Sequence, residues 1–153
     1  MTASAPAPLY VGTAERRGAR WLAAGAVFAL LAVAAGAFAA HGLRARLAPE
    51  ALAVFETAAR YQMYHALALI ACGLAAPRLQ PGPAAGAAGL FIVGIVLFSG
   101  SLYLVSLAGL RMLGIVTPFG GVAWLLAWAL LAWAALGRDR GPTGAQPTAP
   151  PDR

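Results

Sequence analysis

Residues 55–65 of the chain are Phe55-Glu56-Thr57-Ala58-Ala59-Arg60-Tyr61-Gln62-Met63-Tyr64-His65. This stretch leads directly into an apolar run that contains no further charge until Arg78. In hydrocarbon a polar side chain costs free energy unless it finds a partner or reaches the interface, and a charge at the centre of a helix costs about 3 kcal/mol. The stretch therefore marks the polar end of a helix that enters a membrane.

The composition excludes a soluble protein. Of 153 residues, 61% are hydrophobic and 10% are charged, and the uncharged runs are long enough to cross a bilayer. The net charge of +6 comes from eleven arginines and no lysine, which stand singly or in pairs at the ends of apolar runs. This pattern is typical of membrane loops, whereas a nucleic-acid site needs a contiguous basic face. We therefore expect the lipid bilayer as a partner and no nucleic acid.

Four membrane spans are predicted, at about residues 21–40, 57–76, 84–110 and 118–137, because roughly 20 apolar residues cover a hydrocarbon core of about 30 Å. The second helix is expected to begin at Pro49, so that its N-terminal end is partly interfacial. The third follows a helix-breaking turn at Pro81-Gly82-Pro83. The fourth begins at Thr117-Pro118, where threonine suits the cap and proline the first helical position. The expected fold is an all-α membrane protein, a compact bundle of four transmembrane helices.

The two ends of the chain show no apolar periodicity. We expect residues 1–19 and 138–153 to be disordered tails on either side of a transmembrane domain at 20–137. A rival interpretation of the N-terminal part is a signal peptide, with Arg16-Arg17 before the apolar stretch and a cleavage site near Ala37-Phe38-Ala39. The apolar run is longer than the roughly 7 to 15 residues of such a region, so we expect it to be kept as the first span.

The arginines near the span ends predict the orientation in the membrane. With four spans, one side carries Arg16, Arg17, Arg20, Arg78, Arg138 and Arg140. The other side carries Arg44, Arg46, Arg60 and Arg111. Because arginine is favoured on the cytoplasmic side, this excess predicts that both termini are cytoplasmic.

Nearly all polar groups inside the spans fall in the membrane half next to the Arg44 and Arg111 loops. The candidate ligand site or polar cluster consists of His41, Glu56, Arg60, Tyr61, Gln62, His65, Ser101 and Tyr103. Polar side chains at membrane depth face the bundle or water, so this segregation predicts a site that opens outward. A purely structural interpretation is also open. Glu56 and Arg60, four residues apart, would then form an ion pair, and His65 would form a hydrogen bond to a neighbouring helix.

No metal, cofactor or catalytic group is expected. His41, followed by Gly42, suits a helix end with the glycine in the left-handed cap position. It lies at a different estimated depth from His65, and no cysteine cluster or second carboxylate accompanies the two histidines. Cys72 is expected to be a small buried hydrophobic residue. No serine has a credible base partner, so we expect that the protein is not an enzyme.

Small residues predict where helices approach each other closely. Ala32, Gly36 and Ala40 recur at every fourth position of the first span, and small residues at this spacing allow two helix backbones to come together. Close contacts or local irregularities of the backbone are also expected at Gly100, Gly120 and Gly121.

Four motifs, in chain order, resemble the signatures of one family. They are Gly36-Ala37-Phe38-Ala39-Ala40-His41-Gly42-Leu43, Phe55-Glu56-Thr57-Ala58-Ala59-Arg60-Tyr61-Gln62-Met63-Tyr64-His65-Ala66-Leu67-Ala68, Leu97-Phe98-Ser99-Gly100-Ser101-Leu102-Tyr103 and Thr117-Pro118-Phe119-Gly120-Gly121. They are similar to those of the domain-of-unknown-function 423 family, the YgdD-like bacterial inner-membrane proteins, which are related to the small eukaryotic transmembrane protein 256 group. The resemblance implies a compact four-helix protein of the bacterial cytoplasmic membrane. It implies no activity.

Three classes of function are open. The favoured one is a non-enzymatic membrane protein that forms a homo-oligomer or an accessory or scaffold subunit of a larger complex, because the chain is small and has faces rich in alanine and glycine. The alternative is a small transporter, a channel or a bundle that binds a lipid or small ligand at the outer polar cluster. A membrane enzyme that uses Glu56 or a histidine as base has the least support, because no activated nucleophile is evident.

Overall fold

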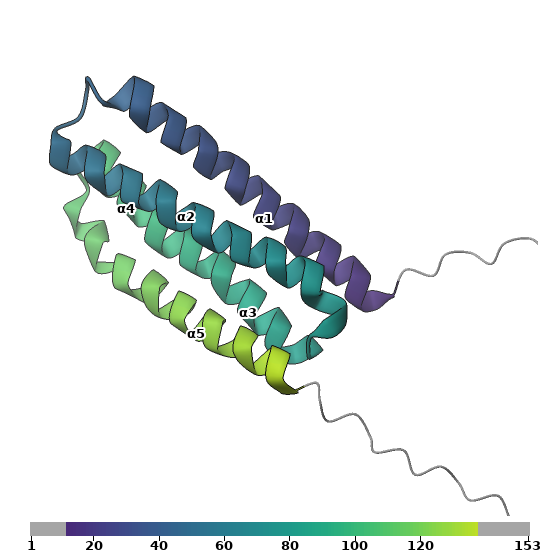
Figure 1. Cartoon of the computed structure of the whole chain (residues 1–153). Coiled ribbons are helices and arrows are strands. Elements are labelled where there is room, and N and C mark those ends of the chain that lie inside the picture. Colours follow the sequence, from purple (N-terminus) through teal and green to yellow (C-terminus); the bar gives the residue numbers. More distant parts are fainter. Residues whose placement is uncertain (1–11, 138–153) are drawn as a thin grey trace, which may run out of the picture.

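The structure, a computed structural model, describes residues 12–137, which form four long antiparallel helices (Figure 1). The first helix consists of α1 (Thr13–Phe38) and the π-helical turn η1 (Ala39–Leu43), and the second consists of α2 (Pro49–Ala75) and the 3₁₀ turn η2 (Ala76–Arg78). The third continues from α3 (Pro81–Gly94) through the π-helical segment η3 (Ile95–Ser99) into α4 (Gly100–Ala108). The fourth consists of the 3₁₀ turn η4 (Arg111–Ile115) and α5 (Thr117–Leu136).

The predicted helical membrane bundle is confirmed. Three of the described helices are long and apolar enough to cross a membrane by themselves, namely Thr13–Leu43, Pro81–Ala108 and Arg111–Leu136. The remaining helix, α2, is the most polar of the four, because it carries the charged and amide side chains of the sequence stretch around residues 55–65. It lies between α1 on one side and the α3–α4 helix on the other (Figure 1).

Prolines mark three helix starts. Pro49 and Pro118 lie in the first turns of α2 and α5, as predicted. The predicted turn at Pro81-Gly82-Pro83 is wrong, because α3 already begins at Pro81. The N–H groups of a first helical turn have no partner within the helix, so proline loses nothing there.

Two further expectations about helix ends need correction. Helix α1 begins at Thr13, so residues 13–19 are helical rather than part of a disordered tail. Residues 1–11 and 138–153 lie outside the described range. Gly42 does not adopt the left-handed cap conformation, because the first helix continues through it as the turn η1. Among the described residues, only Gly109 has a positive φ, of 67°, and it ends α4.

Helices α1 and α2 meet along a seam of small residues. On α1 these are Gly18, Gly25 and Ala32, which are all buried. A Cβ atom at Gly18 would lie 2.5 Å from the carbonyl oxygen of Gly73, and one at Gly25 would lie 2.8 Å from that of Ala66. The backbones therefore touch directly, and any larger side chain at either glycine would push the two helices apart.

The seam follows a seven-residue repeat and not the predicted four-residue repeat. Ala32 is buried in it, but Gly36 and Ala40 are exposed, and a Cβ atom at Gly36 would meet nothing within 4 Å. The reason is geometrical: each residue turns a helix by about 100°, so seven residues return to within about 20° of the same direction, whereas four miss it by about 40°. Within the single chain, Gly36 and Ala40 therefore do not lie at a helix contact, contrary to the prediction.

The α3–α5 pair forms the main core. Here Trp124 fills the space opposite Gly94, and its Nε1 donates a hydrogen bond to the carbonyl oxygen of Phe91 at 3.3 Å. Cys72 is buried in this core, as predicted. Gly120 packs against the backbone of residue 98, also as predicted, but Cβ atoms at Gly100 and Gly121 would meet nothing within 4 Å. Gly100 instead follows the π-helical segment η3, which is a backbone irregularity of the expected kind.

Candidate functional site

The predicted polar residues do not form a single cluster. The structure divides them among five places: a bridge at Gln62 and Tyr103, a hydroxyl pair at Ser101, a stacked ring at His65 beside Tyr61, a groove at Glu56 and Arg60, and an isolated position at His41.

The side chain of Gln62 joins three helices. It is 5% exposed, its Nε2 donates to the carbonyl oxygen of Phe28 on α1 at 2.9 Å, and its Oε1 accepts from the hydroxyl of Tyr103 on α4 at 3.1 Å. The Tyr103 ring packs on Phe55, with ring centroids 4.8 Å apart. Both ends of the amide therefore have partners, and in a membrane such bonds hold helices together.

Ser101 links the α3–α4 helix to the start of α5. Its hydroxyl donates to the carbonyl oxygen of residue 98 at 2.9 Å and lies 2.8 Å from the hydroxyl of Thr117. A serine hydroxyl has one proton, so Thr117 is the donor in the second bond. Ser99 is fully buried, and its hydroxyl has no partner among residues 12–137. The two bonds of Ser101 therefore hold the α3–α4 helix against the start of α5.

His65 has a defined proton arrangement. Its Nδ1 lies 2.8 Å from the carbonyl oxygen of Tyr61 in the same helix. A carbonyl oxygen only accepts, so Nδ1 carries the proton and Nε2 of the neutral ring carries a lone pair. The ring stacks on the indole of Trp124, with centroids 3.6 Å apart and planes 4° apart. The predicted hydrogen bond to a neighbouring helix is therefore wrong, because the contact between helices is this stack.

An aromatic groove lies between α2 and α5 beside this stack. Its volume is about 520 Å³, and its main lining residues are Tyr61, His65, Phe98, Gly121, Trp124 and Trp128. The rim is open to the surroundings, because Tyr61 is 40% exposed and Trp128 is 48% exposed. The residues that α5 contributes to this groove were not predicted from the sequence. The available signal was Trp124 and Trp128, which stand four residues apart on one helix face, as do Tyr61 and His65.

A charged groove lies on the other side of α2, against α1. Its volume is about 310 Å³, and it is lined by Ala32, Gly36, Glu56, Ala59, Arg60 and Met63. Glu56 is half-buried and Arg60 is exposed, and among residues 12–137 no ion pair joins them. The predicted pair is therefore wrong for the single chain. On a helix end that water reaches, a pair four residues apart is worth only about 0.3 to 0.5 kcal/mol, which is too little to order two long side chains unless a partner excludes the water.

His41 stands apart from the other predicted residues. It is exposed in the turn η1 at the end of the first helix. No group of three or more His, Cys, Asp or Glu residues that could hold a metal ion occurs in the described part of the chain. The structure therefore gives His41 no ligand partner.

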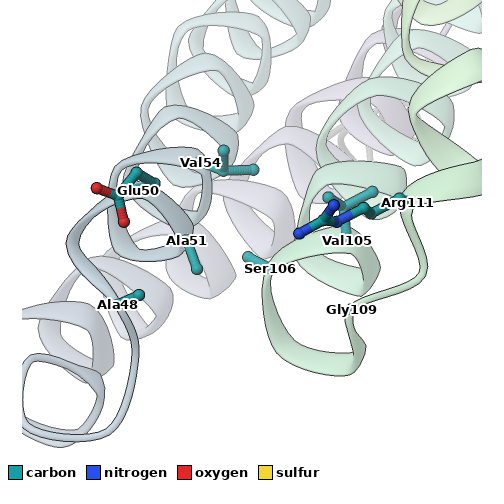
Figure 2. A pocket seen from close by; sticks show the side chains of 8 residues that line it. All are labelled: Ala48, Glu50, Ala51, Val54, Val105, Ser106, Gly109 and Arg111. Carbon is teal, nitrogen blue, oxygen red and sulfur yellow. The ribbon is translucent and has the colours of Figure 1, made fainter.

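A third cavity, of about 420 Å³, lies at the end of the bundle between the start of α2 and the end of α4 (Figure 2). The guanidinium of Arg111 extends toward it, whereas the carboxylate of Glu50 on the opposite rim points away (Figure 2). Ser106 faces the cavity, but its hydroxyl already donates to the carbonyl oxygen of Tyr103 at 3.0 Å. One cation at a wide rim does not form a specific site.

Comparison with known proteins places the chain in a family. The family profile described as a protein of unknown function (DUF423) matches residues 35–121. The UPF0382 membrane protein YwdK of Bacillus subtilis is 45% identical, over 73% of this chain and 92% of the relative. A UPF0382 membrane protein of Staphylococcus epidermidis is 43% identical, over 73% of this chain and 91% of the relative. One of Haemophilus influenzae is 36% identical, over 76% of this chain and 93% of the relative.

No solved structure matches the chain. The relatives carry no enzymatic name, and their shared description is that of a membrane protein. The matched region includes η1, all of α2 and the polar residues of both grooves. The protein therefore belongs to the DUF423 family of membrane proteins, whose biochemical function is unknown.

Proposed function

We propose that the protein is a non-enzymatic membrane protein of the bacterial cytoplasmic membrane that assembles as a homo-oligomer, in its simplest form a dimer, through the charged groove. The main observation is that the Glu56 carboxylate and the Arg60 guanidinium line the same groove without forming an ion pair. They lie next to Gly36, which is exposed and has open space before it. Charges near membrane depth are costly unless they are paired, so a surface of this kind favours a partner.

A second copy of the chain fits this surface by charge. In a two-fold dimer the same patch meets itself, so an acid and a base on one patch give two ion pairs. The two residues are separated by one helical turn, about 6 Å along the axis, which an arginine side chain spans. Gly36 lets the two first helices approach closely at this level.

Charge exchange between two tagged copies tests the proposal. Glu56→Arg leaves two positive residues in the groove, and Arg60→Glu leaves two negative residues. We expect each variant alone to dimerise at least tenfold more weakly than the native chain. Co-expressed, the two variants should associate with each other, because both ion pairs are then restored. Native mass spectrometry from lipid nanodiscs and co-purification of the two tags measure this.

The matched control uses charges outside the groove. Glu50→Arg and Arg111→Glu change the same kinds of charge at the end cavity and should leave association unchanged. A native chain that is monomeric in nanodiscs, or charge variants that self-associate like the native chain, would refute the proposal. A stoichiometric partner of another sequence in place of the second copy would also refute it.

A further inference from the structure

We propose that the aromatic groove binds a lipid-soluble hydroquinone or related phenol, whose ring hydroxyl donates a hydrogen bond to Nε2 of His65. This site lies between α2 and α5 and shares no lining residue with the charged groove between α1 and α2. It therefore goes beyond the proposed assembly and does not depend on it.

His65 can still make one further hydrogen bond. The residue is 7% exposed, and Nδ1 is already engaged with the carbonyl oxygen of Tyr61. Nε2 has no hydrogen-bond partner among residues 12–137, and it is not fully buried, so a molecule in the groove can reach it. Because the neutral ring offers a lone pair at Nε2, the missing partner must be a donor. A hydroxyl group meets this condition, whereas the carbonyl of a quinone does not.

The walls of the groove are flat and aromatic. His65 and Trp124 form a flat stack, and Tyr61 is also nearly parallel to Trp124, with planes 14° apart and centroids at 6.0 Å. Phe98 and Trp128 add further ring faces and edges. Aromatic rings favour offset or edge contacts with another ring. Gly121 leaves open space at its own position in the α5 wall, where a Cβ atom would meet nothing within 4 Å, so a planar ring has space to enter there.

The groove lies away from the ends of the helices that form it. His65 and Trp124 lie in the central parts of α2 and α5, and no residue that lines the groove carries a fixed charge. A phospholipid headgroup would therefore lose its hydration without gaining a counter-charge. A hydroquinone carries no charge, and one of its two hydroxyl groups finds an acceptor at Nε2 of His65. The volume of about 520 Å³ is within the range of small-molecule sites and holds the ring with the first carbons of a tail.

Four probes separate the parts of this proposal. They are 2-decylhydroquinone, its di-O-methyl ether, the corresponding quinone, and a diglyceride with one free hydroxyl. The ether keeps the shape of the ring but has no donor, and the diglyceride keeps a donor but has no ring. Each is titrated, without oxygen, into the native protein in phosphatidylcholine nanodiscs, and the affinity is obtained from the rise of the unfolding midpoint with ligand.

We expect the hydroquinone to bind about tenfold more tightly than its ether, a difference of about 1.4 kcal/mol. The quinone should resemble the ether. His65→Phe keeps a ring on Trp124 but removes Nε2, so its affinity for the hydroquinone should fall to that for the ether. Its unchanged affinity for the ether serves as the measure of an intact groove. His41→Phe, at the other histidine, should change nothing, and Gly121→Leu should fill the groove and weaken both probes.

Several results would overturn the proposal. Equal affinity of the native chain for the hydroquinone and its ether would remove the role of Nε2, as would an unaltered preference in His65→Phe. Diglyceride binding as tight as that of the hydroquinone would remove the role of the ring. Unaltered binding in Gly121→Leu would place the ligand elsewhere. A monomeric protein that shows the expected preferences would refute the assembly proposal and leave this site standing.

Discussion

Gln62 shows how a polar residue inside the membrane can be structural. Its amide needs both a donor and an acceptor as partners, and it finds them on two other helices. When one partner is removed, the polar group that remains cannot form a hydrogen bond to water instead. The loss of stability therefore exceeds that caused by removing a hydrogen bond at the surface.

We expect Gln62→Leu to lower the free energy of unfolding by about 1 to 2 kcal/mol, because the Tyr103 hydroxyl loses its acceptor. Tyr103→Phe should lower it by about 0.6 kcal/mol, the usual value of such a bond in a membrane protein. The double variant should resemble Gln62→Leu, since both changes remove the same bond. Reversible unfolding by dodecyl sulfate in mixed micelles measures all three.

Tyr64→Phe is the matched control, because this tyrosine is on the same helix and 53% exposed. It should leave the stability unchanged. Strictly additive effects of Gln62→Leu and Tyr103→Phe would show that the two side chains do not interact.

The sequence predicted which polar residues face the bundle better than it predicted their partners. Gln62, His65 and Tyr103 are all partly or wholly buried inside the bundle, as their position within apolar spans implied. Their partners depend on how each helix is rotated about its axis. In a membrane protein the outside of a helix is as apolar as its inside, so the hydrophobic pattern does not fix that rotation. The single predicted cluster therefore became several separate contacts.

At the scale of helices, the seam between α1 and α2 decides which glycines matter. Both a four-residue and a seven-residue repeat of small residues are present in α1, and an alanine-rich chain offers many such matches. Helix bounds were easier to predict, because prolines and the lengths of apolar runs mark them directly. The π-helical turn η1 has no comparable signal in the sequence.

Gly25→Leu should destabilise the fold by about 2 to 3 kcal/mol, because a Cβ atom there already overlaps the backbone of α2. Gly36→Leu should have no measurable effect on the unfolding of the monomer, since this position faces open space. Thermal unfolding in dilute micelles, where any dimer dissociates, compares the two. The opposite order of stability would place the close approach of α1 and α2 at the four-residue repeat.

At the scale of the whole molecule, the start of α1 and the end of α5 lie at the same end of the bundle (Figure 1). By sequence, the side with Arg16, Arg17, Arg20, Arg78, Arg138 and Arg140 carries more arginine than the side with Arg44, Arg46, Arg60 and Arg111. We therefore expect both termini in the cytoplasm. A fluorescent reporter that matures only in the cytoplasm should be bright after residue 140 and dark in the connection at residues 44–48. The reverse pattern would invert the orientation.

The unequal apolar character of the helices has a consequence for biosynthesis. Helix α2 is not among the three described helices that are apolar enough to cross a membrane by themselves, yet it is the helix that α1 contacts most and that follows α1 after a short connection. We therefore expect the translocation machinery to receive α1 and α2 as one hairpin, with the glycine seam closing before α3 is made. In the same reporter assay, a chain that ends after Arg78 would show α2 crossing the membrane only when α1 precedes it.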